Sequence, residues 1–250
     1  MRQAIDYLDR LGRAAEIETV WKMLCDELDR FGFDRLLYGY DRFGSENATG
    51  RWEDSLILSN MDRAYLKEFI EHEHYKHAPL SQWALHNTGA RSWSYLDTAY
   101  AKMGAKQRRV VDLNLSYGIR AGYSISFATP APRARAVISM GAKSGLEQGD
   151  INDIWRRDGR LISVIANMSH LKIISLPYHL ERARLSRRQQ EVLNWVAEGK
   201  TCQDIATIMG VSIGTVEKHL RLVRQKLDVD TTPQAVLKAA FWNQMFVVKV

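Results

Sequence analysis

Four helix-start signals follow one another near the end of the sequence, and they constrain the fold more than any other feature. In such a signal, a Ser or Thr can accept a hydrogen bond from a backbone N–H of the first helical turn, and in the first two signals an acid or amide three residues later can return one. The signals are Ser186 with Gln189, Thr201 with Asp204, Ser212, and Thr232 directly before Pro233. They predict four short helices, the last with proline at its first position.

The middle two of these helices are joined by a very short turn. Residues 201–226 comprise a short helix, the turn Gly210-Val211-Ser212 and a longer helix. Gly199 and Gly210 follow the ends of the first two helices, where a left-handed residue is commonly needed. These are the dimensions of a helix-turn-helix.

The longer helix has an apolar face and a polar face. Its apolar stripe, which we expect to face the core, is Val216, Leu220, Val223 and Leu227. The opposite face carries Gly214, Glu217, Lys218, Arg221 and Gln225, with Arg224 and His219 on the flanks. Small and polar side chains suit base edges in the major groove, and the flanks suit phosphates. Any surface helix is polar outside, but the turn, the caps and the local charge together favour DNA binding.

Positive charge is concentrated in the same part of the chain. Residues 176–250 contain 11 Lys and Arg against 7 Asp and Glu, whereas residues 1–175 contain 24 against 22. An excess confined to one small region is typical of a surface that binds phosphates. The charge excess alone fits an ordinary solvated surface equally well, so it supports the prediction of DNA binding only together with the helix pattern.

The region upstream has a mixed pattern. A long helix is predicted from about 149 to 174, and Pro177 then prevents a regular helix from continuing. This divides the chain into a domain at 1–175, a linker at 176–184 and a domain at 185–250. Within the first domain, the patterns predict helices at 17–31, 62–75 and 101–117, strands at 35–41, 55–59, 121–129 and 135–142, and a turn at 130–133. The fold class expected is α+β: an α/β/α sandwich with a central, mainly antiparallel sheet, plus a C-terminal domain of four helices.

Composition and motifs exclude several classes of protein. With 46% apolar and 26% charged residues among 250, the chain is globular rather than disordered or fibrous. It has no apolar run long enough for a membrane span, and MRQAIDYLDR lacks a signal-peptide core, so we expect a cytoplasmic protein without a membrane partner. Cys25 and Cys202 form neither a disulfide framework nor a zinc set, and we expect buried or neutral thiols. The sequence contains no P-loop, GxSxG or HExxH motif and no cysteine–histidine pair in a plausible context, so we expect neither an enzyme nor a cofactor.

Residues 185–229, LSRRQQEVLNWVAEGKTCQDIATIMGVSIGTVEKHLRLVRQKLDV, closely resemble the DNA-binding module of LuxR-type transcription regulators. The resemblance implies that Glu191 is structural rather than catalytic. It also implies double-stranded DNA as a partner, and RNA polymerase and a second copy of the chain as further partners. Together with the helix pattern, it gives these DNA-contacting residues: Lys200, Thr201, Ser212, Gly214, Thr215, Glu217, Lys218, His219, Arg221, Arg224 and Gln225.

The N-terminal region resembles the autoinducer-binding domain of quorum-sensing LuxR proteins. The resemblance is carried by GFDRLLYGYD (32–41), YLKEFIEHEHYKHAPL (65–80), Trp93 and YGIRAGYSISF (117–127). The paired acidic residues of a phospho-receiver domain are absent near the predicted strands. The resemblance implies an enclosed, mainly apolar pocket for an N-acyl homoserine lactone between the sheet and helices.

This sequence keeps some of the family's ligand-binding residues and replaces others. Positions that the family keeps are Pro79, Trp93, Gly118 and Gly122, and Ser139 lies where a hydroxyl often bonds the acyl amide. The family's lactone-binding tryptophan, its acyl-binding tyrosine and its amide-binding aspartate correspond to Tyr65, Phe69 and Ala78. An amide N–H buried without its acceptor costs ~1–3 kcal/mol, or one to two powers of ten in affinity. Tyr65 retains a hydroxyl donor and Ser139 or Ser126 can accept the amide, so we expect an aryl or branched-acyl lactone, or a related non-lactone signal.

Three alternatives remain open. His72, His74 and His77 suggest a metal site, although their spacing suits neither one helix face nor a known zinc set. A regulator that needs no ligand, with an N-terminal domain used for dimerisation or protein binding, is the competing function. A two-fold dimer would bind an inverted-repeat DNA site. Residues at near-heptad spacing on the long helix are candidates for the dimer interface, although packing on the sheet explains them at least as well. They are Ile151, Ile154, Asp158, Leu161, Ile165, Met168 and Lys172.

Overall fold

The computed structural model describes residues 2–41, 55–129, 134–177 and 184–245 of the chain. The chain forms two compact units, Met1–Ile173 and Ile174–Val250, which are described separately here. The predicted turn at 130–133 lies outside the described residues.

A five-stranded sheet, antiparallel throughout, forms the centre of the N-terminal unit. Its order is β2-β1-β5-β4-β3. The strands are β1 (Phe33–Asp41), β2 (Leu56–Ser59), β3 (Gly89–Ser92), β4 (Gly122–Phe127) and β5 (Arg135–Ala142). Ser124 on β4 lies directly opposite Ser139 on β5, and Gly122 lies opposite Gly141. The predicted antiparallel sheet is confirmed, and β3 is an addition to it.

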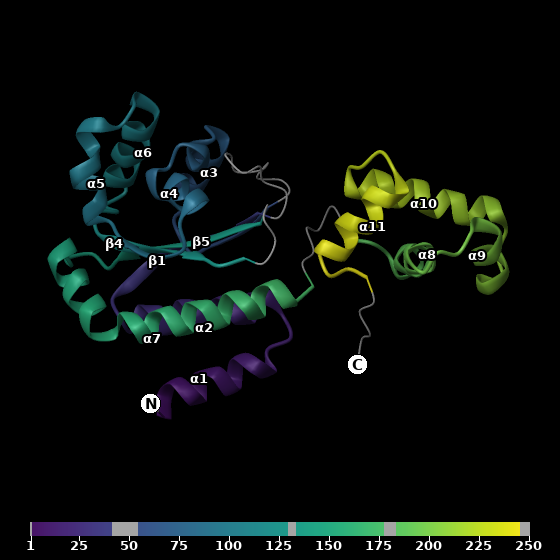
Figure 1. The fold of residues 1–250 in the computed structure, drawn as a ribbon, viewed down its shortest axis with the longest axis horizontal. Helices are drawn as coiled ribbons and strands as arrows, with labels where there is room; N and C mark the ends of the chain where they lie inside the picture. Colours follow the sequence, from purple (N-terminus) through teal and green to yellow (C-terminus); the bar gives the residue numbers. More distant parts are fainter. Residues whose placement is uncertain (1, 42–54, 130–133, 178–183, 246–250) are drawn as a thin grey trace. The chain divides into compact units, whose positions relative to one another are not determined.

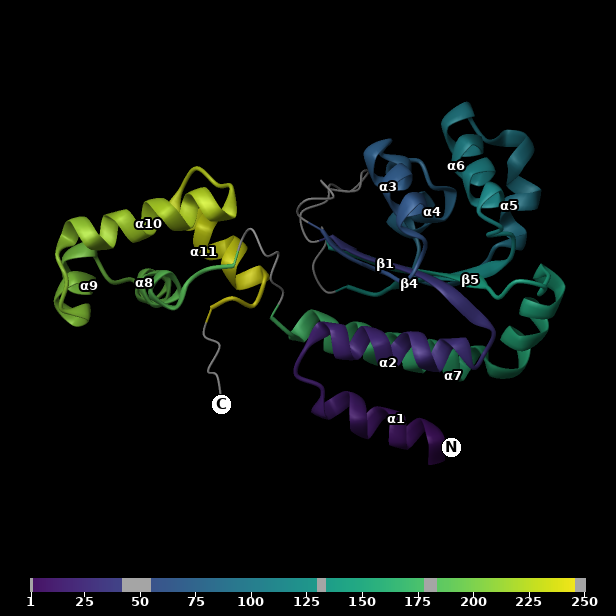
Figure 2. The ribbon, with the colours of Figure 1, turned by 180° about the vertical axis from the view of Figure 1, so that it is seen from behind.

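Helices cover both faces of the sheet, as Figures 1 and 2 show. On one side lie α1 (Arg2–Arg13), α2 (Ile17–Asp29) and α7 (Gln148–Ser175), and on the other lie α3 (Arg63–Glu71), α4 (Pro79–His86), α5 (Ser94–Ala99) and α6 (Ala105–Ser116). On the α7 side, the Tyr38 hydroxyl lies 2.9 Å from Nδ1 of His170, and the two buried side chains join β1 to α7. The predicted α/β/α sandwich is confirmed.

Two predicted helices are shorter than expected because local backbone geometry ends them. The helix predicted at 62–75 stops at Glu71, since Glu73 adopts a left-handed backbone with φ 54, and a 3₁₀ turn, His74–Lys76, follows. The helix predicted at 101–117 begins only at Ala105, after a 3₁₀ turn at Tyr100–Lys102.

The C-terminal unit consists of α8 (Arg187–Ala197), α9 (Cys202–Met209), α10 (Ile213–Leu227) and α11 (Thr232–Phe241). Ser186 with Gln189 and Thr201 with Asp204 form reciprocal caps, and the Ser212 hydroxyl accepts from the Thr215 N–H, as predicted. The prediction that Thr232 caps the last helix is wrong: Thr231 is the cap and exchanges hydrogen bonds with Gln234. Thr232 is instead the first helical residue, and Pro233 follows it as the second.

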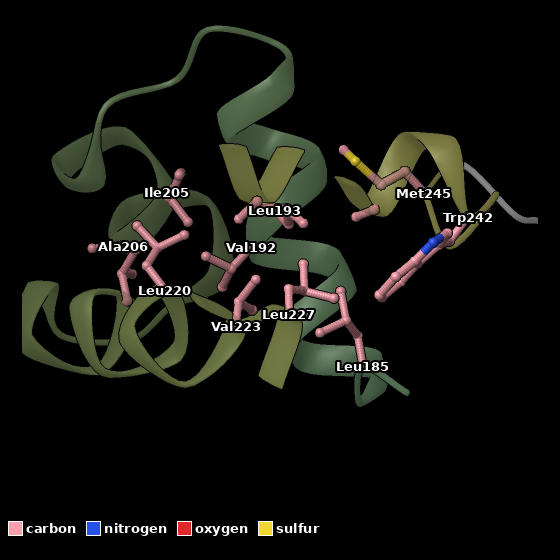
Figure 3. Close-up of a cluster of buried hydrophobic side chains, with 13 residues drawn as sticks. Leu185, Val192, Leu193, Ile205, Ala206, Leu220, Val223, Leu227, Trp242 and Met245 are labelled. Atoms are coloured by element: carbon pink, nitrogen blue, oxygen red, sulfur yellow. The ribbon is translucent and has the colours of Figure 1, made fainter. Parts of the chain in front are cut away.

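The core of the C-terminal unit gathers side chains from these helices, as Figure 3 shows. The predicted stripe of α10, Val216, Leu220, Val223 and Leu227, is buried in it. Val192 and Leu193 of α8 and Ile205 of α9 meet that stripe. Burial of this face fixes which side of α10 remains at the surface.

Candidate ligand cavity and nucleic-acid interface

A cavity of about 110 Å³ lies between the sheet and the helices α3 and α4. Its walls are mainly apolar and aromatic, which suits an apolar ligand group. The residues whose side chains line it are Leu37, Ile57 and Val137 from the sheet, Phe69 and Ile70 from α3, Tyr75 after it, and Ala84 and Leu85 from α4. Tyr38 and Tyr40 also border it, but their rings lie against His170 of α7, on the other face of the sheet. The cavity occupies the space in which the family resemblance predicted the signal.

A second cavity of about 60 Å³ adjoins the first. The two share the lining residues Leu37, Phe69, Ser81 and Ser139. The second cavity is additionally lined by Tyr65, Ala78, Pro79, Trp93, Asn114 and Ile119. A larger cavity is thus next to a smaller one, and both have polar lining residues: Asp41, Ser55 and Arg135 at the larger, and Tyr65 and Asn114 at the smaller.

Most of the residues predicted for the ligand lie at these cavities. Tyr65, Phe69, Ala78, Pro79, Trp93 and Ser139 all line one or both. Gly122 and Ser126 are not among the lining residues that the structure describes. Gly122 instead lies beneath the Trp93 ring, and the Ser126 hydroxyl donates to the Ala84 carbonyl, because α4 packs over that end of β4.

Tyr65 already uses the hydroxyl that was predicted to contact a ligand. Its O–H donates to Oδ1 of Asn114 at 2.9 Å. The ring is 3% exposed and stacks on Phe69, with ring centroids 5.5 Å apart. Burial raises the pKa of Tyr65 well above its ordinary value, so the hydroxyl remains a neutral donor.

Trp93 and two serines form a hydrogen-bonded chain along the sheet. The indole Nε1 of Trp93 donates to the Ser124 hydroxyl at 3.0 Å, and the Ser124 and Ser139 hydroxyl oxygens are 3.1 Å apart. Trp93 is therefore a wall of the second cavity rather than a donor into it. Ser139 ends the chain at the cavities, and a serine hydroxyl can both donate and accept.

Burial shifts the pKa of one histidine of the 72–77 cluster and of one cysteine. Desolvation, with His72 nearby, lowers the pKa of the buried His74 imidazole. Within the described ranges, no group of three or more His, Cys, Asp or Glu is placed to hold a metal ion. Burial raises the pKa of the Cys25 thiol to about 12, so this thiol is protonated at neutral pH.

The outer face of α10 presents the small and polar side chains predicted for the major groove. All of them are exposed: Gly214, Glu217, Lys218, Arg221 and Gln225. Thr215 is half-buried, and its hydroxyl lies 2.9 Å from that of Ser212 in the cap at the start of α10. A straight helix with this exposed polar face has the shape that enters a major groove.

The residues flanking this face are partly engaged within the protein. Arg224 donates from Nη1 to the Thr232 hydroxyl at 3.0 Å, and His219 is half-buried, with Nδ1 unpaired in the described structure. Lys200 and Thr201 are exposed at the start of α9. The Thr201 hydroxyl and N–H hydrogen-bond to Asp204 and hold the pKa of that carboxyl below its ordinary value. Thr201 therefore has a capping role besides any contact with DNA.

Sequence reasoning missed two polar residues of the ligand site. Asn114 lies on α6 and Ser124 on β4, and their partners, Tyr65 and Trp93, are far from them in the chain. An asparagine on the apolar side of a predicted helix was the one available signal for Asn114. The serine at 124 gave none, because serine is common on both faces of a strand.

Comparisons with known proteins agree with this geometry. Residues 16–173 match the autoinducer binding domain, and residues 183–239 match the bacterial regulatory proteins of the luxR family. The transcriptional activator EchR of Dickeya chrysanthemi is 25% identical over 229 residues, 87% of each chain. The quorum-sensing-dependent regulator RpaR of Rhodopseudomonas palustris is 34% identical over 131 residues, 52% of this chain and 51% of that protein.

Among solved structures, the crystal structure of Escherichia coli SdiA has the same fold. The TM-score is 0.56 at 18% identity, covering 98% of this chain and 99% of that one. The two relatives are named as transcriptional regulators, which supports a regulator rather than an enzyme. The chain belongs to the luxR family of bacterial regulatory proteins, with an autoinducer-binding domain followed by a helix-turn-helix DNA-binding domain.

Proposed function

We propose that the chain is a transcription regulator whose DNA binding responds to a small aryl or branched-acyl homoserine lactone, or to a related acyl signal. The observation that carries the proposal is the pair of adjoining cavities between the sheet and α3 and α4. An enclosed, mostly apolar space with a few convergent polar groups is the usual form of a small-molecule site.

Cavity size favours a compact acyl group. An apolar cavity of roughly 150 Å³ accommodates a benzene molecule, and the larger cavity measures about 110 Å³. Because the cavity is smaller than this reference, it favours a group no larger than one ring or a short branched chain, and a long alkyl chain requires further space. The aromatic side chains of Phe69 and Tyr75 suit a flat group.

The polar groups also favour an unusual ligand. Ala78, which replaces the family's aspartate, has no acceptor for an acyl amide, and the Ser126 hydroxyl is engaged by Ala84. Ser139 remains the acceptor for that amide. A ligand whose amide reaches Ser139, or which lacks the amide, avoids the ~1–3 kcal/mol cost of an unpaired buried N–H.

Thermal unfolding of the full chain tests the proposal. Benzoyl-, cinnamoyl-, isovaleryl-, butanoyl- and dodecanoyl-homoserine lactones are compared, after mass spectrometry has shown that no ligand was co-purified. A ligand at a hundred times its Kd adds ~2.7 kcal/mol to the unfolding free energy. We expect a dose-dependent rise in Tm for an aryl or branched member and the smallest rise for dodecanoyl. No rise with any member would favour a regulator that needs no ligand.

On the DNA side, the two groups of α10 residues are expected to behave differently. Replacing Arg221 or Glu217 with alanine should change base preference at one position of the site, by ~1–3 kcal/mol, because both are exposed on the face of α10 that we propose for the major groove. Replacing Lys218 or Arg224 should weaken binding to all sequences and lower the salt dependence. Binding to a randomised DNA library, selected at two salt concentrations, separates the two effects. An equal, sequence-independent loss from all four variants would contradict the division.

The dimer that we propose uses α7, but through different residues from those predicted. Ile151 and Ile165 are buried within the domain, and Lys172 donates to the Gly12 carbonyl, so the near-heptad stripe does not form one exposed surface. Val164, Met168 and Leu171 lie one turn apart and are 44%, 41% and 51% exposed. A second copy of the chain meeting this stripe would bury it by two-fold symmetry.

A two-fold dimer is expected to bind an inverted repeat. The half-sites should be about one helical turn apart, and a repeat should bind more tightly than a single half-site. Gel-shift titration of both DNA fragments, with wild-type protein and with Leu171→Glu, measures this. The variant should lose the advantage of the repeat while retaining binding to the half-site.

We place this regulator in the cytoplasm, with RNA polymerase as its partner at the promoter. Among the described residues, no helix is long and apolar enough to cross a membrane.

A further inference from the structure

The second cavity is lined by an amide whose donors have no partner. Asn114 is half-buried on α6, and its Oδ1 accepts the Tyr65 hydroxyl. A carboxamide also carries two N–H donors on Nδ2. Across residues 2–41, 55–129 and 134–177, the structure pairs neither of these with an acceptor. A donor held at an apolar cavity is stabilised when a ligand supplies an oxygen.

Tyr65 fixes the orientation of this amide. The Tyr65 ring is held between Phe69, stacked at 5.5 Å, and Tyr117, edge-on at 5.3 Å, so its hydroxyl has little freedom. Because that hydroxyl donates to Oδ1, the opposite side of the amide carries the N–H groups. The other donor nearby, Trp93 Nε1, is used by Ser124. Among the described residues, Asn114 therefore supplies the side-chain N–H donors of the second cavity that no other protein group accepts.

We infer that Asn114 determines specificity by donating from Nδ2 to a carbonyl oxygen at the head of the ligand, with Tyr65 positioning its amide. The inference rests on the proposed function and adds the group that is recognised. The ligand class is an acyl compound whose head carries a carbonyl acceptor, such as a lactone. The acyl part then extends into the larger cavity, past the shared residues Phe69 and Ser139.

Two probes that differ only in that carbonyl test the inference. They are N-benzoyl-homoserine lactone and N-benzoyl-3-aminotetrahydrofuran, which keeps the ring and lacks the carbonyl. Calorimetric titration of the full chain should give wild-type protein an affinity for the lactone about ten- to a hundredfold higher. Asn114→Leu, of similar volume, should bring the two affinities to within about threefold by weakening the lactone alone.

Further variants keep the test decisive. Unchanged tetrahydrofuran binding shows that the cavity of Asn114→Leu is intact. If that variant loses both ligands, the outcome rests on Asn114→Asp, which still accepts from Tyr65 but repels a carbonyl and should prefer the tetrahydrofuran. Tyr65→Phe should reduce the lactone preference by a smaller factor, because it releases the amide without removing it.

The possible failures are distinguishable. If wild-type protein binds the lactone and both Asn114 variants keep the wild-type ratio, the role of Asn114 is overturned and the proposed function stands. If wild-type protein binds neither probe nor any lactone of the thermal panel, the proposed function is overturned and the inference with it.

Discussion

Replacing Gly122 with alanine is expected to destabilise the N-terminal unit by roughly 3 kcal/mol, the upper end of the usual cost of overpacking. A Cβ at this position would lie 2.2 Å from the Met140 carbonyl oxygen and 3.0 Å from two ring carbons of Trp93. The backbone of β5 cannot move away without breaking its pairing with β4. The Trp93 ring would move instead, and with it the wall of the second cavity.

Calorimetry should therefore record a Tm lower by roughly 6–12 °C for Gly122→Ala. Gly39→Ala is the matched control, since Gly39 also lies in a strand and an added Cβ there meets no atom within 4 Å. Its Tm should remain within a few degrees of wild type. Equal losses in the two variants would mean that alanine harms these strands generally, and that contact with Trp93 is unimportant.

This assignment revises the role that the family resemblance suggested for Gly122. A glycine at a matching position was predicted near the ligand, whereas the structure places it between β5 and Trp93. Matching positions reveal that a residue type is required and leave the reason open. A positional match therefore cannot distinguish a ligand contact from a packing contact one layer behind it.

The parts of the fold predicted well are those with local signals. The helices α8, α9 and α10 have caps in the sequence, and the strands β1 and β5 are long enough to show a pattern. The elements α1, α4, α5 and β3 were not predicted. The last three were missed because they are short, whereas α1 was missed although it has 12 residues. GARS, the sequence of β3, has no apolar alternation and pairs only because β4 offers it an edge.

The polar part of the site could not be predicted for a related reason. The pairs Tyr65 with Asn114 and Trp93 with Ser124 form when separate helices and strands pack, so no local spacing encodes them. Ser126 shares a strand face with Ser124, and only the position of α4 decides that its hydroxyl meets the Ala84 carbonyl. Residue types predicted the composition of the cavity, and packing decided which hydroxyls remained available.

Restoring an acid in the second cavity is expected to broaden the ligand range. Ala78 is 9% exposed, lines that cavity beside Tyr65 and Trp93, and is the N-cap residue of α4 without a side-chain cap. Ala78→Asp would place a carboxylate where the family resemblance has the acceptor of the acyl amide. Affinity for butanoyl-homoserine lactone should rise about ten- to a hundredfold, because a previously unpaired amide N–H gains an ionised acceptor.

Ala84→Asp is the matched control for this substitution. Ala84 is also a buried alanine of α4, but it lines the larger cavity and not the second one. A carboxylate there lies away from Tyr65 and Trp93, so the variant should gain no affinity for the lactone. Calorimetric titration of both variants with the butanoyl lactone and with its ester analogue, α-butanoyloxy-γ-butyrolactone, in which an oxygen replaces the amide N–H, isolates the amide contact. A gain for the ester as large as that for the lactone, or a loss for both, would mean that the amide of a bound signal does not lie at Ala78.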